Sequence, residues 1–388
     1  MKFQAKDQGL HSKQHNSIKF IHASDIHLGC AQYQNEYRAD DFITAFKQVL
    51  YLGIKNSVDF IILAGDVFTS IDILPEKLLQ IIKLLEKFHK RTNNIIPIIA
   101  IEGNHDLRRY SRGLKTERTQ SWLKLMNHLG LMILLQACEN GDKRQKLEFQ
   151  EYNSKSKIGN LLKIRFANIF GTSYRGERPK SHILNLYNSI EKKEDEFNIL
   201  LQHFGIAGQM DNVPGLNLCV VNKLSNKVDY LALGHFHLQY TIGGWIYNPG
   251  STEAACSVDN LFNRGVFFVE VFKDANGFSK RVKSIKLINR EILWKTICLP
   301  FQFKEKNKFF EYLLSQLSLY LKDFRNELKP TNYQLPLLYL KIIGIKPVKT
   351  CKITKKEIRK LICGSFSILD ARIYFEYNRP SKSIVQYL

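Results

Sequence analysis

The stretch that decides the fold is IKFIHAS, residues 18–24, which leads directly into Asp25-Ile26-His27. Short, nearly continuous apolar runs of this kind are typical of strands that are buried on both faces of a sheet. Four more runs end in the same way, at residues 58–64 before Gly65, 95–101 before Gly103, 197–201 before His203 and 228–233 before Gly234. The sequence therefore predicts five buried strands, each followed by a polar motif.

Helical patterns separate the first three of these strands. One runs from Asp41 to about Lys55, and the other runs from Pro75, which suits a first helical position, to about Lys90. Alternating strands and helices imply parallel pairing, and sites in parallel sheets form at the carboxyl ends of the strands. We therefore expect the polar motifs to converge.

The chain of 388 residues is long enough for two domains. After about residue 290 the pattern changes to strand, helix, strand, helix and strand, at residues 294–299, 304–321, 337–345, 355–362 and 371–377. Residues 133–175 indicate hairpins or an insertion. We predict a flexible N-terminal tail over residues 1–17, a catalytic domain over 18–290 and a second domain over 291–388.

The net charge indicates the class of partner, and the cysteine pattern indicates the compartment. The chain has 57 Lys and Arg against 36 Asp and Glu, a net charge of +21 that favours a polyanion such as nucleic acid. A membrane surface, a ribosome or a lysine-rich solvated surface stays open on charge alone. The seven cysteines are dispersed and fit reduced thiols, and neither a signal peptide nor a membrane span is evident. We expect a soluble cytoplasmic protein without a membrane partner.

The polar motifs carry the side chains that a two-metal phosphodiester site needs. They are Asp25-Ile26-His27, Gly65-Asp66, Gly103-Asn104-His105-Asp106, His203 and Gly234-His235-Phe236-His237. Asp, Asn and His supply the oxygen and nitrogen donors that bind paired divalent ions. Alone, each motif is weak, since a Gly-Asp pair is usually a turn and a lone histidine is usually a core residue. Five motifs in this order are hard to produce by chance.

These motifs resemble the calcineurin-like metallophosphoesterase superfamily. The resemblance implies an α/β fold, a four-layer αββα sandwich with a smaller C-terminal α+β cap domain. It also implies two divalent metal ions, for which Mn²⁺ suits the donors and iron, zinc or magnesium stays open. One ion would be held by Asp25, His27, Asp66 and His237, and the other by Asp66, Asn104, His203 and His235. His105 would act at the scissile phosphate, and Asp106 would support it.

The residues after the first motif narrow the resemblance. His27-Leu28-Gly29, Gln32-Tyr33, Glu36-Tyr37-Arg38 and Asp40-Asp41-Phe42 are similar to the double-strand-break repair nucleases that include bacterial SbcD. This implies a DNA exonuclease or endonuclease that processes DNA ends in repair, with an SMC-like ATPase partner of the Rad50 or SbcC type. Many relatives carry a histidine where this chain has Thr69, which leaves the balance of exonuclease and endonuclease activity open. Whether the chain forms a homodimer also stays open.

Basic and aromatic residues near the motifs are candidate DNA contacts, because cations neutralise phosphates and tyrosines stack on unpaired bases. They are Tyr33, Tyr37, Arg38, Arg108, Arg109, Arg112, Tyr174, Arg175 and Arg178. Each could instead be a solvated charge or a framework ring. Two other functions stay open. One is a phosphodiesterase or phosphatase acting on a nucleotide or other small phosphate ester. The other is a DNA-binding scaffold with a vestigial metal site. Every ligand position of the motifs holds a suitable residue, which argues against this interpretation.

Overall fold

The computed structural model describes residues 16–107, 121–136, 147–321 and 335–377. The chain divides into two compact units between Ile288 and Asn289, next to the boundary expected at residue 290. Most of the predicted N-terminal tail lies outside the described residues.

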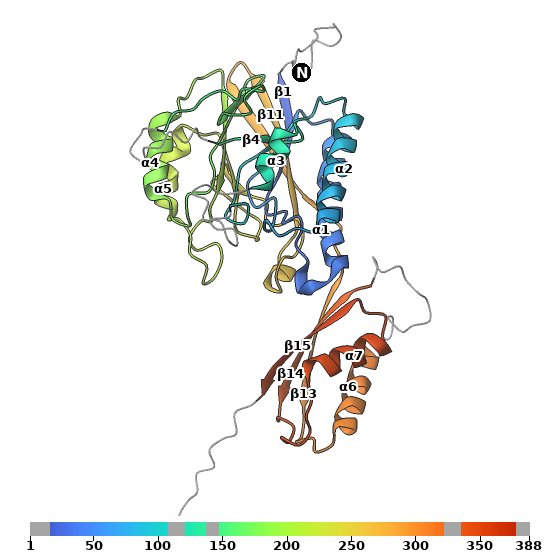
Figure 1. Cartoon of the computed structure of the whole chain (residues 1–388). Coiled ribbons are helices and arrows are strands. Elements are labelled where there is room, and N and C mark those ends of the chain that lie inside the picture. Colours follow the sequence, from blue (N-terminus) through green and yellow to red (C-terminus); the bar gives the residue numbers. More distant parts are fainter. Residues whose placement is uncertain (1–15, 108–120, 137–146, 322–334, 378–388) are drawn as a thin grey trace, which may run out of the picture. The chain divides into compact units, whose positions relative to one another are not determined.

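Two mixed six-stranded sheets form the centre of the large unit (Figure 1). The first sheet has the order β12-β11-β1-β2-β3-β4 and the second has the order β5-β6-β7-β8-β10-β9. The first sheet contains β1 (Ser17–Ala23), β2 (Phe60–Leu63), β3 (Ile98–Ala100), β4 (Ile133–Leu134), β11 (Gly265–Asp274) and β12 (Gly277–Lys286). The second contains β5 (Leu161–Ile164), β6 (Ala167–Gly171), β7 (Phe197–His203), β8 (Tyr230–Gly234), β9 (Tyr240–Ile242) and β10 (Ile246–Asn248). The five predicted strands are confirmed as β1, β2, β3, β7 and β8.

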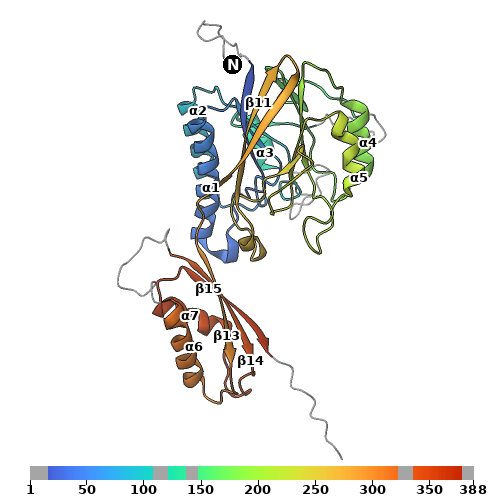
Figure 2. The same ribbon diagram turned by 180° about the vertical axis from the view of Figure 1, so that it is seen from behind.

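Helices cover the outer faces of the two sheets (Figures 1 and 2). The first sheet is covered by α1 (Glu36–Lys55), α2 (Pro75–Arg91) and α3 (Trp122–His128), and the second by α4 (Lys180–Ser189) and α5 (Leu218–Val221). Short 3-10 turns are η1 (Gln32–Gln34), η2 (Asn222–Asn226) and η3 (Val258–Leu261). Helix α1 begins earlier than predicted because the side chain of Asn35 caps it, accepting from the Tyr37 N–H. None of the described helices of the chain is both long and apolar enough to span a bilayer.

Three apolar layers hold the large unit together, and alternation along the strands assigns residues to them. In β1, Ile21 packs with residues of α1 and α2, whereas Phe20 packs between the sheets. In β7, Leu201 packs between the sheets, whereas Leu200 packs with residues of α4. Because successive strand residues point to opposite faces, this pattern requires a helix layer outside each sheet. The predicted four-layer αββα sandwich is confirmed.

The small unit is a three-stranded sheet with helices on one face (Figure 2). Its elements are β13 (Ile292–Leu299), α6 (Lys306–Tyr320), β14 (Leu337–Gly344), α7 (Lys355–Ser365) and β15 (Asp370–Tyr377), in the predicted order. The expectation for this unit was α+β. All three strands are parallel, and each is joined to the next through a helix, so in detail the unit is α/β. Its own core contains Leu338 and Leu340 of β14, with Phe309 of α6 and Ile358 of α7.

Candidate metal centre

The polar motifs lie where strands of the two sheets end. Asp25 follows β1 and Asp66 follows β2, and these two strands are parallel. In the other sheet His203 ends β7 and His235 follows β8, again in a parallel pair. The carboxyl ends of parallel strands meet at one edge of a sheet, so both sheets present their motifs to a common region.

The first cluster of donor atoms comes from Asp25, His27 and His237, whose ligand atoms lie within 4.8 Å of one another. The Nε2 atoms of His27 and His237 are 3.1 Å apart, and Nε2 of His237 is 3.8 Å from Oδ1 of Asp25. Nδ1 of His27 is buried and has no hydrogen-bond partner among the described residues. A buried imidazole with an unused nitrogen, facing another imidazole and a carboxylate, fits a divalent cation.

The second cluster is built around Asp66 and Asn104. Oδ2 of Asp66 lies 3.2 Å from Nε2 of His203, which is also 3.2 Å from Oδ1 of Asn104. The same amide oxygen is 3.0 Å from Nδ1 of His235. Asp66 also groups with His27 and His105, so its carboxylate reaches both clusters. The structure thus brings all seven predicted ligands together, with the Asp66 carboxylate close to residues of both clusters.

The backbone is strained at four of the seven candidate ligands. Asp25, His27, Asp66 and His235 have φ values of 49°, 50°, 50° and 88°. The left-handed region is uncommon for residues other than glycine, and such strain persists where the surrounding structure fixes it and function uses it. Here it turns side chains at strand ends toward a common point.

Two motif glycines are required by close approaches. A Cβ on Gly65 would lie 2.4 Å from Nδ1 of His203, and a Cβ on Gly103 would lie 2.2 Å from Oδ1 of Asp66. Only glycine therefore lets these loops pass behind the donor side chains.

Hydrogen bonds behind the site orient two of the histidines. Nδ1 of His203 donates to the carbonyl of Ala64 at 2.8 Å, and Nδ1 of His237 donates to the Asp259 carboxylate at 2.8 Å. Because a carbonyl or carboxylate can only accept, Nδ1 carries the proton and Nε2 stays available to a metal. Sequence reasoning missed Asp259, since the residue follows no apolar run and belongs to no recognisable motif.

The electrostatics of the site divide the histidines into two pairs. Burial opposes the charge of His203 and His237, but the carboxylates of Asp66 and Asp259 beside them raise the pKa of each to about 9. Burial lowers the pKa of His27 to about 3 and that of His235 to about 4. The carboxyl pKa of Asp66 is held below its usual range, against burial, by His203. The carboxylates beside His203 and His237 therefore favour the charged form of both imidazoles.

His105 and Asp106 have different surroundings. His105 is exposed at the site, its N–H donates to Oδ1 of Asp66 at 2.8 Å, and its Nδ1 lies 3.1 Å from the Thr69 carbonyl oxygen. Asp106 is buried, and its carboxylate accepts from the N–H groups of Gly103 at 2.9 Å and Phe68 at 2.8 Å. Asp106 was expected among the catalytic residues. Its carboxylate ties two motif loops together, which suits a residue that supports His105.

The candidate DNA contacts fall into three groups. Arg108, Arg109 and Arg112 lie outside the described residues. Tyr37, Arg175 and Arg178 are exposed, Tyr33 is half-buried, and the ring of Tyr174 lies 6.0 Å from the rings of both His203 and His235. Arg38 is 0 % exposed, so the expectation that it contacts DNA is wrong. Its guanidinium is taken up by Asp41 and Glu253, because a buried cation needs buried anions.

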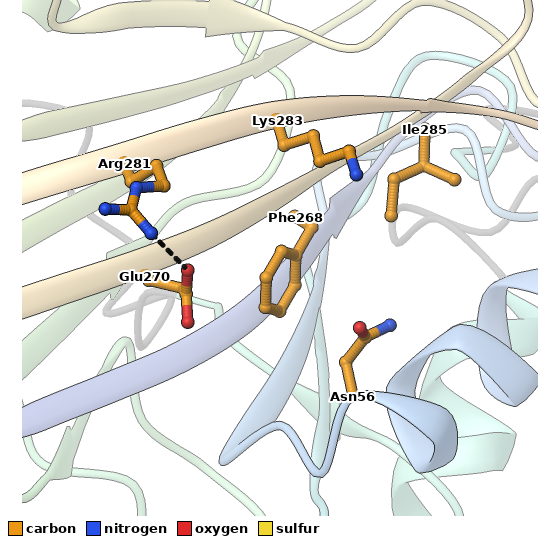
Figure 3. A pocket seen from close by; sticks show the side chains of 6 residues that line it. All are labelled: Asn56, Phe268, Glu270, Arg281, Lys283 and Ile285. Carbon is orange, nitrogen blue, oxygen red and sulfur yellow. Dashed lines mark ion pairs between the residues drawn. The ribbon is translucent and has the colours of Figure 1, made fainter.

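A groove of about 370 Å³ lies elsewhere on the large unit (Figure 3). Phe268 and Ile285 line it together with Arg281 and Lys283, and its one carboxylate, Glu270, pairs with Arg281. Glu270 lies opposite Lys19, near the start of β1, whereas Asp25 follows the end of that strand. The groove lies along the outer, α1-side face of the first sheet, and none of its lining residues is a candidate ligand.

Comparison with known proteins agrees with this geometry. The profile of calcineurin-like phosphoesterases matches residues 18–239, which include every candidate ligand. Curated relatives named "DNA double-strand break repair protein Mre11" include that of Archaeoglobus fulgidus, 30 % identical over 61 % of this chain and 50 % of its own length. The relative from Haloferax volcanii is 34 % identical over 68 % of this chain and 52 % of its own length. The relative from Saccharolobus solfataricus is 26 % identical over 66 % of this chain and 61 % of its own length. The chain thus spans about half the length of the curated relatives it matches.

Proposed function

Because the chain belongs to the calcineurin-like phosphoesterase family, we propose that it is a metal-dependent phosphodiester hydrolase that cuts DNA. The observation that carries the proposal is the convergence of seven donor side chains from both sheets on one region, with Asp66 common to the two clusters. We assign Asp25, His27, Asp66 and His237 to one ion and Asp66, Asn104, His203 and His235 to the other. The donors are nitrogen and oxygen without thiolate, which suits Mn²⁺.

The protein's own groups account for placement and proton transfer. When bound, two divalent ions supply Lewis-acid polarisation of the phosphodiester and a water of lowered pKa. His105 is exposed beside the cluster and donates Nδ1–H to the Thr69 carbonyl, which leaves Nε2 to exchange a proton at the scissile phosphate. Asp106 holds the loop that carries His105 against the loop that carries Asp66. The chain therefore fixes the reacting groups relative to the ligands.

The choice of DNA rests on charge and on the relatives. Residues 289–388 hold 19 Lys and Arg against 8 Asp and Glu, which is +11 of the total of +21 in about a quarter of the length. A surface of this sign suits phosphates, and exposed Arg175 and Arg178 follow Tyr174 at the site. We propose that the small unit helps to bind DNA as a cap, that the substrate is a DNA end in repair, and that the partner is an SMC-like ATPase. Such a substrate would place the protein in the cytoplasm.

The experiment is hydrolysis by the purified chain with Mn²⁺, on end-labelled duplex and single-stranded DNA and on bis(p-nitrophenyl) phosphate. Cutting of DNA that disappears in His105→Gln, while Mn²⁺ binding persists, supports the proposal. Hydrolysis of the small ester without cutting or binding of DNA would keep the metal site and reassign the substrate to a nucleotide or another small phosphate ester. Product lengths from the two DNA ends would also show the balance of exonuclease and endonuclease activity.

A further inference from the structure

The Asp259 carboxylate is a rigid support behind His237. Asp259 is 2 % exposed and lies in η3, outside every motif that predicts a ligand. Its Oδ2 accepts Nδ1–H of His237 at 2.8 Å and the N–H groups of Ala255 at 2.8 Å and Cys256 at 3.0 Å. The thiol of Cys256 donates to Oδ1 at 3.1 Å. The main chain therefore fixes this carboxylate, and the imidazole must turn to meet it.

The segment that carries Asp259 is fastened to helix α1 by a buried ion pair. Arg38 of α1 donates to Glu253 at 3.1 Å and to the carbonyl of Ala254 at 2.9 Å. Its second terminal nitrogen pairs with Asp41 at 2.6 Å, and the whole side chain is buried. A buried guanidinium with anions and a carbonyl around it is costly to displace. Helix α1 thus restrains the residues immediately before Asp259.

The same segment also meets the first ligand cluster through its main chain. The N–H of Ser251 donates to the carbonyl of His237 at 3.1 Å. The Ser24 hydroxyl lies 3.2 Å from the carbonyl of Gly250 and 2.6 Å from Oδ2 of Asp25. Residues 250–259 are therefore linked by hydrogen bonds to His237 and, through Ser24, to Asp25.

The second ligand cluster is supported in another way. Nδ1 of His203 donates to the main-chain carbonyl of Ala64, and Nδ1 of His235 faces Asn104 inside the cluster. The Asp25 carboxylate accepts the main-chain N–H of His235 at 3.1 Å, but among the contacts of the described residues no carboxylate behind the cluster accepts from the imidazole ring of either histidine. A side-chain substitution can therefore remove the hydrogen-bond acceptor behind His237, whereas the acceptor behind His203 belongs to the main chain and stays.

We propose that Asp259, held in place by the Arg38–Glu253 pair, is a positioning residue that sets the affinity of one of the two metal ions. By fixing the tautomer and direction of His237 it supports the ion assigned to Asp25, His27 and His237, and it leaves the ion assigned to Asn104, His203 and His235 unaffected. Removing such a support behind a ligating histidine typically costs about 10- to 100-fold in metal affinity. The inference rests on the proposed function, since it concerns the same metal centre.

The test is Mn²⁺ binding to the full chain, measured without DNA by calorimetry and electron paramagnetic resonance, for Asp259→Asn. The matched control is Asp211→Asn, which removes an exposed carboxylate of the same size. We expect the affinity of one ion to fall about 10- to 100-fold and that of the other to stay at the wild-type value. The spectrum of a coupled ion pair should give way to that of an isolated ion at Mn²⁺ concentrations between the two affinities. The control should bind both ions as the wild type does.

A structural role alone would give another result. If Asp259→Asn only loosened the fold, both ions would weaken together and the melting temperature of the metal-free chain would fall. Either that result or two ions of unchanged affinity would overturn the proposal. Should Asp259→Asn fail to fold, Glu253→Gln gives the same test through the Arg38 pair, with the same ion affected. A wild-type chain that binds fewer than two ions would instead count against the proposed function itself.

Discussion

Adding a single methyl group at Gly103 should strongly weaken the binding of both ions. In Gly103→Ala the new Cβ would lie 2.2 Å from Oδ1 of Asp66 and 2.4 Å from its main-chain nitrogen. Ordinary contact begins at 3.4 Å, so the carboxylate would have to retreat by about 1.2 Å. Metal–ligand distances tolerate only about 0.2 Å, and Asp66 is common to the two clusters. We expect both ions to bind at least about 100-fold more weakly, with a loss of about 1–3 kcal/mol in the free energy of unfolding from the overpacking.

Calorimetric titration with Mn²⁺, beside thermal unfolding of the metal-free chain, measures both effects. The matched control is Gly364→Ala in α7, where an added Cβ meets nothing within 4 Å. That variant should bind two ions normally and keep or slightly raise its melting temperature, since alanine is the better helix former. If Gly103→Ala binds two ions with wild-type affinity, metal binding does not depend on the present position of the Asp66 carboxylate, and the prediction is refuted.

Three further predictions follow from the same geometry. Asp66→Ala should lose both ions together, measured as bound metal per chain after gel filtration, and a variant that keeps one ion would rule out the bridging assignment. His105→Gln should keep both ions and lose about 10²- to 10⁴-fold in turnover of the DNA substrate, so that an equal loss of metal would contradict a role in proton transfer. Mn²⁺ binding at pH 7 should release about two protons, because a pKa of about 9 keeps His203 and His237 protonated until a metal displaces their protons. Titration in buffers of different ionisation enthalpy detects those protons.

The same pKa shifts give the metal-free chain a pH dependence with a definite sign. His203 and His237 have a higher pKa folded than unfolded, so their contribution to stability is complete below about pH 6.5 and is lost as the pH rises through about 9. Melting temperatures of the metal-free chain should therefore fall between pH 7 and pH 10. A melting temperature that rises over this range would contradict the assignment.

Much of the fold could be predicted because its central strands have a clear sequence pattern. Buried strands such as β7 are continuous apolar runs, and each of the five ends in a polar motif whose glycine or ligand marks the turn. The three-residue strands β9 and β10 carry no such signal and were not predicted, and neither were the longer strands β11 and β12. β9 and β10 pair with each other, but each is too short to show the apolar run or the alternation that predicts a strand.

The ligand positions could be predicted for the same reason, whereas their supports could not. Asp66 and His203 each stand at the end of a buried strand, so topology alone brings them together. Asp259 is in a turn 22 residues after His237, and only tertiary packing brings its carboxylate to that ring. Arg38 stands in a stretch that resembles a nuclease family, yet nothing local shows that its guanidinium is buried against Glu253, 215 residues away. Sequence periodicity reports which face of an element is buried, but not which distant polar group meets it.

The most direct test of the central claim is a crystal structure of the chain grown with Mn²⁺, with anomalous scattering recorded at the manganese edge. The account predicts two peaks about 3.5–4 Å apart. One should lie among Asp25, His27 and His237 and the other among Asn104, His203 and His235, with the Asp66 carboxylate touching both. A single peak, or two peaks that do not share Asp66, would contradict a dinuclear centre at this site.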